Sequence, residues 1–227
     1  MMNEIIKKQL EAYQPNFLKY GDSPKGTFQN NTTTQYERFE QLLAPLLRIK
    51  PEGFSICDIG SGVCDLHQYL LQKNIAHEYT GIEIVPEMVA TAQEKYPEIT
   101  LMNVDITSEE IPQRFDFVVI SGTLNILGSV AADAWEEFVY QLVQAAFHLS
   151  TIGLSFNGLT TYSTFRAEDL YYLSPEQTFG FIQRKLSRFC TLNTASPLFE
   201  VSYAVFQPSF MATQYAHPDF KKYFPDA

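Results

Sequence analysis

Apolar residues recur at helical spacing in two segments near the start of the chain, residues 3–14 and residues 35–48. Each segment therefore predicts a helix with one apolar face. Residues 15–34, which lie between them, are polar and rich in turn formers, so we expect a loop there. Thr34 and Glu37 have the spacing of a capping box at the start of the second helix. The apolar face of the first helix consists of Ile5, Ile6, Leu10 and Tyr13.

From residue 54 onward, short apolar runs of strand length alternate with helical patterns. Such a series predicts an α/β fold with a seven-stranded, mostly parallel sheet and helices on both faces. A short link without a helix joins the last two strands, so we expect an antiparallel last strand. The predicted strands span residues 54–59, 77–84, 100–104, 115–121, 152–158, 189–193 and 199–206. The predicted helices in this part of the chain span residues 64–73, 86–95, 131–149 and 175–187.

Composition and charge narrow the class of protein. The 227 residues suit one domain with a full core. The formal net charge of −10 argues against a nucleic-acid partner, because phosphate binding depends on clustered Lys and Arg. Three cysteines without a CxxC pair, and histidines without ligand spacing, predict neither a disulfide framework nor a metal site. No apolar run approaches the roughly 18 residues that span a bilayer, and the N-terminus lacks a signal-peptide pattern, so we expect no membrane partner and a cytoplasmic location.

The stretch FSICDIGSGVCDL, residues 54–66, is the strongest local signal for a ligand site. A short apolar strand ends in a turn that contains Gly60 and Gly62, and a helix pattern follows at once. Glycine lets the backbone turn sharply and approach a ligand closely, and the helix start offers free N–H groups. We therefore expect a small cofactor at this turn. A lone GxG is weak evidence, and other residues must identify the cofactor.

Three acidic residues lie at the ends of successive predicted strands. Asp58 immediately precedes the glycine turn, Glu83 lies 21 residues after Gly62, and a further 22 residues lead to Asp105. The carboxyl ends of neighbouring parallel strands meet at one edge of the sheet, where ligands bind. Glu83 there can accept hydrogen bonds from both hydroxyls of a ribose, and Asp105 can accept one from an adenine amine. For Asp105 alone, a role as a turn cap is an equally good interpretation.

With these motifs in place, the chain resembles the class I S-adenosylmethionine-dependent methyltransferases. The resemblance covers roughly residues 35–207 and depends on the segments CDIGSGVCDL (57–66), YTGIEIVPEMV (79–89), NVDI (103–106), FDFVVISGTLN (115–125) and FEVSYAVF (199–206). It implies a Rossmann-like fold, S-adenosyl-L-methionine as the cofactor and methyl transfer as the activity. Cys64 departs from the pattern, since the family often has a third glycine there.

The resemblance also implies roles for individual residues. The glycine turn and Ser121 would line the methionine end of the cofactor, Glu83 would hold the ribose and Asp105 the adenine. Ile84 and Ile106 would enclose the adenine ring. The residues expected to bind the cofactor on these grounds are Asp58, Gly60, Ser61, Gly62, Glu83, Ile84, Asp105, Ile106 and Ser121.

The N-terminal segment resembles that of a subgroup of bacterial methyltransferases of undefined substrate, through YGDSPKGTF (20–28) and QYERFEQLL (35–43). In related enzymes this segment folds over the cofactor, so we expect a helical lid. Arg38 is the candidate partner of the cofactor carboxylate, since a guanidinium suits that group. The alternative is a helix arginine that pairs with Glu37 or Glu40. Tyr20 and Lys25 are candidates for the pocket mouth, with a solvated loop as the alternative.

The acceptor is a small molecule in the leading hypothesis, because the lid and the acidic charge both disfavour a macromolecule. Asn125, Asn157 and Tyr162 are candidate acceptor-binding residues. No general base stands out, so the catalytic residues are left open; His67 and His148 lie in helical stripes typical of packing or surface positions.

Two other hypotheses stay open at this point. A nicotinamide-dependent oxidoreductase would share the turn, although its third glycine is missing and it has no need of Asp105. A non-catalytic protein could keep the same cofactor pocket. In domain terms we expect an N-terminal helical cap over residues 1–50, a methyltransferase core over 51–207 and a tail over 208–227 that packs on the core.

Overall fold

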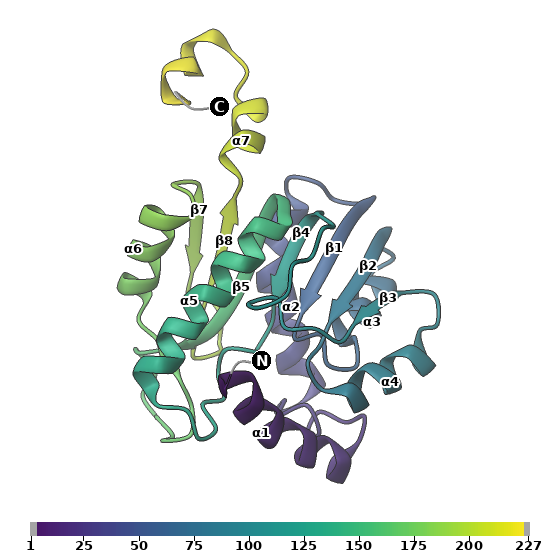
Figure 1. Cartoon of the computed structure of the whole chain (residues 1–227). Helices are drawn as coiled ribbons and strands as arrows, with labels where there is room; N and C mark the ends of the chain where they lie inside the picture. Colours follow the sequence, from purple (N-terminus) through teal and green to yellow (C-terminus); the bar gives the residue numbers. More distant parts are fainter. Residues whose placement is uncertain (1–3, 225–227) are drawn as a thin grey trace.

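An eight-stranded sheet runs through the molecule, and helices cover both of its faces (Figure 1). The computed structural model describes residues 4–224. The strands are β1 (Phe54–Ile59), β2 (His77–Ile82), β3 (Thr100–Met102), β4 (Phe115–Ile120), β5 (Ser150–Thr160), β6 (Tyr172–Leu173), β7 (Cys190–Asn193) and β8 (Glu200–Phe206). The helices are α1 (Glu4–Tyr20), α2 (Thr32–Leu47), α3 (Asp65–Gln72), α4 (Pro86–Lys95), α5 (Ala132–Leu149), α6 (Pro175–Lys185), α7 (Pro208–Gln214) and the 3-10 helix η1 (Pro218–Tyr223).

The order of strands in the sheet confirms the predicted topology. Seven strands follow the path β3-β2-β1-β4-β5-β8-β7, and the pairs from β3 to β5 are parallel. β8 is antiparallel to both of its neighbours, β5 and β7. The two-residue strand β6, which the sequence does not predict, pairs with the end of β5. The glycine turn and the ends of the neighbouring parallel strands therefore meet at one edge of the sheet.

The central strands bury both of their faces, which explains their continuous apolar sequence. Along β4, Val118 and Ile120 face a core that α5 closes, whereas Phe117 and Val119 face a second core beneath α2 and α3. This alternation follows from the two-residue period of a strand. In the part of the chain that the structure describes, no helix is long and apolar enough to cross a bilayer.

The N-terminal region is more helical than predicted. α1 continues past Pro15 to Tyr20, because a proline inside a helix removes one hydrogen bond without necessarily ending the helix, and here Phe17 packs in a small core with Met88. α2 begins at Thr32, and its N-cap is Asn31, whose side chain accepts a hydrogen bond from the backbone of Thr34. The predicted capping box is therefore wrong: a competing cap lies three residues earlier. Residue 3 of the first predicted helix lies outside the described residues.

The C-terminal tail contains a helix and a 3-10 helix that the sequence does not predict. α7 begins against the core, where Phe210 and Met211 pack, and the chain then leaves the sheet (Figure 1). The tail returns to the body through Phe224, whose ring stacks on that of Phe189 with the two centroids 5.3 Å apart. Residues 225–227 of the tail lie outside the described part of the chain.

Candidate functional site

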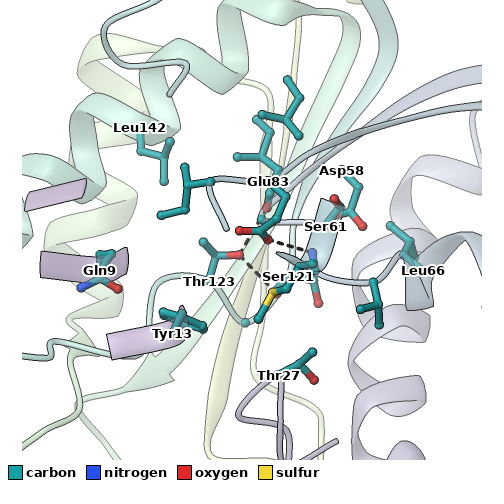
Figure 2. Close-up of a pocket in the computed structure, with 18 of the residues that line it drawn as sticks. Gln9, Tyr13, Thr27, Asp58, Ser61, Leu66, Glu83, Ser121, Thr123 and Leu142 are labelled. Atoms are coloured by element: carbon teal, nitrogen blue, oxygen red, sulfur yellow. Dashed lines mark hydrogen bonds between the residues drawn. The ribbon is translucent and has the colours of Figure 1, made fainter. Parts of the chain in front are cut away.

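A cavity of about 1050 Å³, part of it open to solvent, lies at the carboxyl ends of the parallel strands (Figure 2). α1 forms one wall, and the glycine turn and the residues that follow β4 form another. The structure brings together nine of the ten residues that are predicted to bind the cofactor. These nine wall residues are Asp58, Gly60, Ser61, Gly62, Glu83, Ile84, Asp105, Ile106 and Ser121.

The glycine turn needs glycine for two physical reasons. Gly60 and Gly62 have φ values of +73° and +55°, a region that favours glycine. In addition, a Cβ atom at Gly60 would overlap the Oγ1 atom of Thr123. The turn after β1 and the loop after β4 are therefore in direct contact, and together they shape one end of the cavity.

Glu83 has the hydrogen-bonding capacity that a ribose requires. Its two carboxylate oxygens accept one backbone N–H each, from Gly62 and from Val85, both at 2.9 Å. Because each oxygen can accept a second bond, the carboxylate offers one site to each of two vicinal hydroxyls. Burial raises the pKa of Glu83, and the backbone donors oppose that rise. The residue thus fits the ribose of S-adenosylmethionine, and its backbone bonds hold it in place.

Asp58 is a buried acid beneath the glycine turn. It accepts a hydrogen bond of 2.6 Å from the hydroxyl of Tyr79, and 3% of the residue is exposed. Burial raises the pKa of Asp58 to about 7; the Tyr79 hydrogen bond lowers it, and the charges of Glu83 and Asp65 add to the rise. Asp58 therefore changes its charge near neutral pH in the wall of the cavity.

Asp105 caps its own turn, as the alternative interpretation predicts. Its Oδ1 atom accepts from the backbone and the hydroxyl of Thr107, and Oδ2 accepts from the hydroxyl of Ser108. One acceptor position remains on Oδ2, which is enough for a single amine donor. The cap and an adenine contact are therefore compatible. Ile84 and Ile106 also line the cavity.

Cys64 occupies a strained backbone position at the start of α3. Its φ of +65° is the left-handed conformation that favours glycine, and its side chain is fully buried. This is the position where the resembled family often has glycine. Burial raises the pKa of the Cys64 thiol to about 12, so the thiol stays protonated.

α1 and the loop after it contribute wall residues that are not among the predicted site residues. Gln9 donates to the carbonyl oxygens of Ile126 and Leu127, which ties the helix to the loop after β4. Tyr13 also lines the cavity, and burial together with the nearby charge of Glu83 raises its pKa. The one sequence signal for the packing of α1 against the cavity is the apolar face that is predicted for its first part. Thr27 and Gln29, in the loop after α1, are further polar wall residues that are not among the predicted site residues. Others lie elsewhere in the chain: Gln35 in α2, Asp65 in α3 and Thr123 after β4.

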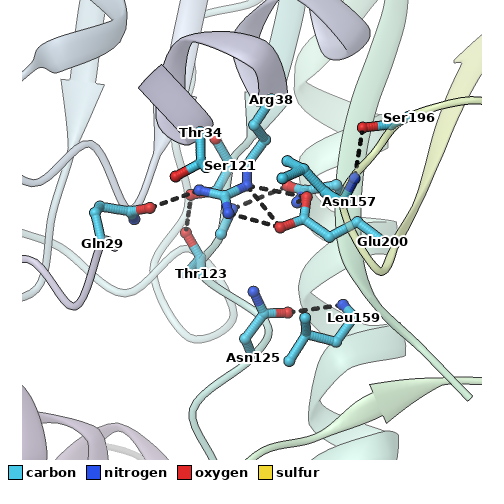
Figure 3. Close-up of polar contacts among 12 residues, drawn as sticks. Gln29, Thr34, Arg38, Ser121, Thr123, Asn125, Asn157, Leu159, Ser196 and Glu200 are labelled. Carbon is cyan, nitrogen blue, oxygen red and sulfur yellow. Dashed lines mark hydrogen bonds and ion pairs between the residues drawn. The ribbon is translucent and has the colours of Figure 1, made fainter. Parts of the chain in front are cut away.

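Arg38 does not belong to the cavity wall, although it lies close to it (Figure 3). Its guanidinium forms an ion pair with Glu200 at 2.6 Å and donates to the side chain of Gln29 at 2.5 Å. The alternative pairing with Glu37 or Glu40 is wrong, because the partner comes from β8. Arg38 already has a carboxylate partner, Glu200. Its contact with the cofactor carboxylate stays a prediction.

The candidate acceptor residues do not line the cavity. Asn125 accepts a bond from the backbone of Leu159, and Asn157 contacts Glu200. Tyr162 is exposed and bonds to Glu176. Lys25 lies over the ring of Tyr20 at 4.1 Å, outside the wall. Contact of these residues with an acceptor stays a prediction.

The two histidines expected at packing or surface positions lie away from the cavity. His67 is buried, and its Nδ1 atom is 2.9 Å from Nε2 of His77. His148 is exposed near the end of α5. Among residues 4–224, no group of three or more His, Cys, Asp or Glu side chains could hold a metal ion.

Comparison with known proteins identifies the family. The family model described as "Methyltransferase domain" matches residues 56–145. The Mycobacterium tuberculosis protein named "Putative methyltransferase Rv1506c" is 31% identical over 157 residues, which are 68% of this chain and 93% of that protein.

Solved structures share the fold. The magnesium protoporphyrin IX methyltransferase ChlM from Synechocystis PCC 6803, crystallised with bound SAM, superposes with a TM-score of 0.61 at 16% identity over 89% of this chain and 98% of that one. The N-methyltransferase NodS from Bradyrhizobium japonicum WM9, in complex with S-adenosyl-L-homocysteine, gives a TM-score of 0.60 at 14% identity over 90% of this chain and all of the other. This chain belongs to the methyltransferases, and it has the fold of the class I S-adenosylmethionine-dependent methyltransferases. The nicotinamide-dependent alternative is therefore set aside.

Proposed function

We propose that this methyltransferase uses S-adenosylmethionine as its cofactor and acts on a small-molecule acceptor. The observation that carries the proposal is the cover over the cavity: α1 and the loop after it supply Ile6, Gln9, Tyr13, Thr27 and Gln29 to its wall. A cofactor site covered in this way admits a small acceptor more readily than a folded macromolecule. The net charge of −10 supports the absence of a nucleic-acid partner. Three cysteines without a disulfide pattern suit a reducing compartment, and this supports a cytoplasmic location as part of the same proposal.

Within this proposal Asp105, Glu83 and the glycine turn would hold the adenine, the ribose and the methionine end of the cofactor. Glu83 accepts from the two ribose hydroxyls with the acceptor positions that its backbone bonds leave free. Asp105 accepts from the adenine amine. The methionine end would be held by Asp58, Gly60, Ser61, Gly62 and Ser121, which line the cavity together.

The bound cofactor supplies an activated methyl group on a sulfonium. The chain's own contribution is to hold the reacting groups in line and to keep water out, and orientation of this kind is worth roughly 7–11 kcal/mol. The titratable residues in the described wall are Tyr13, Asp58, Asp65, Glu83 and Asp105. The four acids already accept hydrogen bonds from donors of the chain. Burial and the charge of Glu83 raise the pKa of Tyr13, so its hydroxyl keeps its proton. We therefore infer that the acceptor arrives as a ready nucleophile.

A transfer assay tests the proposal. Purified protein is incubated with methyl-labelled S-adenosylmethionine and a panel of small acids, amines and phenols, and labelled products are separated from the cofactor. Methylation of at least one panel member is expected. Tight cofactor binding without any labelled product, across the panel and with cell-extract metabolites, contradicts the proposal and favours a non-catalytic cofactor-binding protein.

A further inference from the structure

A buried ion pair links the N-terminal segment to the antiparallel strand β8, next to the cavity (Figure 3). Nε and Nη2 of Arg38 both donate to Glu200, at distances of 2.6–3.1 Å. The two side chains are 10% and 9% exposed. The two residues are separated by 162 positions in the sequence. A two-pronged charged contact with this little exposure holds both side chains in one orientation.

Glu200 has a second partner on the neighbouring strand β5. Its Oε2 atom accepts a bond of 2.6 Å from the Nδ2 atom of Asn157, a residue with 1% exposure. The other end of the Asn157 amide, Oδ1, accepts the backbone N–H of Gly122 at 2.9 Å. Both ends of the Asn157 amide are therefore used, which fixes its orientation.

Both ends of this network reach the cavity wall. Gly122 and Gln29 line the cavity, and a Cβ atom at Gly122 would lie 3.2 Å from Nε2 of Gln29. Gly122 has a φ of +70° and immediately precedes Thr123, the residue in contact with the glycine turn. The network thus ends at the wall that faces the methionine end of the proposed cofactor position.

We propose that Glu200 is a positioning residue for the methionine end of the cofactor pocket. On one side it holds Arg38, which orients the wall residue Gln29. On the other side it holds Asn157, which orients the backbone of Gly122. The carboxylate of Glu200 does not line the cavity itself, so its effect on the cofactor passes through these partners. This inference rests on the cofactor assignment and on the position proposed for the methionine end.

Two ligands separate this role from a general structural one. S-adenosylhomocysteine carries the amino-acid part, whereas 5′-methylthioadenosine has the same adenosine and sulfur without it. Calorimetry with both ligands on Glu200→Gln and Asn157→Ala is expected to show S-adenosylhomocysteine weakened by about tenfold or more, with methylthioadenosine changed less than about twofold. Asn157→Ala leaves the Arg38 ion pair in place, so its effect cannot come from a direct contact of Arg38 with the cofactor carboxylate.

Ser155→Ala is the matched control, because the buried Ser155 hydroxyl also links β5 to β8, through the carbonyl oxygen of Tyr203 at 3.0 Å, without reaching the cavity. It is expected to leave both affinities unchanged. If Glu200→Gln does not fold, the double variant Arg38→Met with Glu200→Leu replaces the ion pair with apolar side chains and must show the same ligand selectivity.

Equal weakening of both ligands in the Glu200 and Asn157 variants, or no weakening of S-adenosylhomocysteine, overturns the positioning role. Either result with a wild-type protein that binds both ligands leaves the cofactor assignment standing. A wild-type protein that binds neither ligand overturns the cofactor assignment as well.

Discussion

Replacement of Asp58 by asparagine removes an ionisable group that is buried in the cavity wall, and we expect it to change how stability depends on pH. Burial raises the pKa of Asp58 from its ordinary 3.8 to about 7 in the folded protein. Between these pH values the folded protein keeps a proton that the unfolded chain releases, so the free energy of unfolding falls as the pH rises. A difference of one between the folded and unfolded pKa corresponds to about 1.4 kcal/mol, so the free energy of unfolding is lower by about 4 kcal/mol at pH 8.

The asparagine side chain cannot ionise, and its carbonyl oxygen can still accept the hydrogen bond from Tyr79. The stability of Asp58→Asn relative to the wild type should therefore rise between about pH 4 and pH 7 and stay constant above that range. Urea unfolding at several pH values from about 4.5 to 8.5, without cofactor, measures this difference.

A control variant keeps the charge and removes its partner. Tyr79→Phe deletes the hydrogen bond that lowers the pKa of Asp58, so the fall in its stability should continue to a higher pH than in the wild type. The reasoning is refuted if the difference between Asp58→Asn and the wild type is the same within about 1 kcal/mol at about pH 4.5 and pH 8.

Three further variants test other parts of the site. Gly60→Ala should lower the affinity for S-adenosylhomocysteine at least about tenfold, through backbone strain and the overlap with Thr123. Adding Thr123→Ala to this variant should restore only part of the affinity, because the strain remains. Full affinity in Gly60→Ala alone contradicts this expectation. Cys64→Gly should be more stable than Cys64→Ala by about 1 kcal/mol in urea unfolding. Both variants lose the thiol, but only glycine relieves the strain of the φ of +65°. The opposite order of stability contradicts this expectation. Tyr13→Phe should keep the melting temperature of the wild type, because the Tyr13 hydroxyl makes no hydrogen bond among the described residues. Its calorimetric affinity for S-adenosylhomocysteine should fall about threefold to tenfold, because the residue lines the cavity. An unchanged affinity removes Tyr13 from the site.

The parts of the fold that could be predicted from the sequence have strong local patterns. The bounds of β1 are those predicted, because an uninterrupted apolar run ends in glycine. The bounds of α4 are also those predicted, because Pro86 lies at its first turn. The first predicted helix is shorter than α1, because Pro15 is a typical stop signal and the tertiary packing of the residues beyond it cannot be seen in a single sequence.

The candidate site likewise contains residues that could be predicted from the sequence and residues that could not. Glu83 and Asp105 could be placed at the cavity edge of the sheet because their spacing follows the period of a strand–helix unit, and their contact with the cofactor stays a prediction. The partner of Arg38 could not, because no local pattern links it to Glu200, a residue on a different element 162 positions away. Gln29 likewise joins the wall only through the fold of the loop before α2. Long-range pairs of this kind depend on the tertiary structure, and the sequence alone contains no spacing rule for them.

The central claim is that Glu83 holds the ribose of S-adenosylmethionine in this cavity. Calorimetric titration of S-adenosylhomocysteine into the wild type and into Glu83→Ala tests it most directly. We expect saturable one-to-one binding to the wild type and at least about tenfold weaker binding to the variant, because two hydroxyls lose a charged acceptor. Equal affinity of the two proteins would contradict the claim, and so would the absence of binding to the wild type at high micromolar ligand.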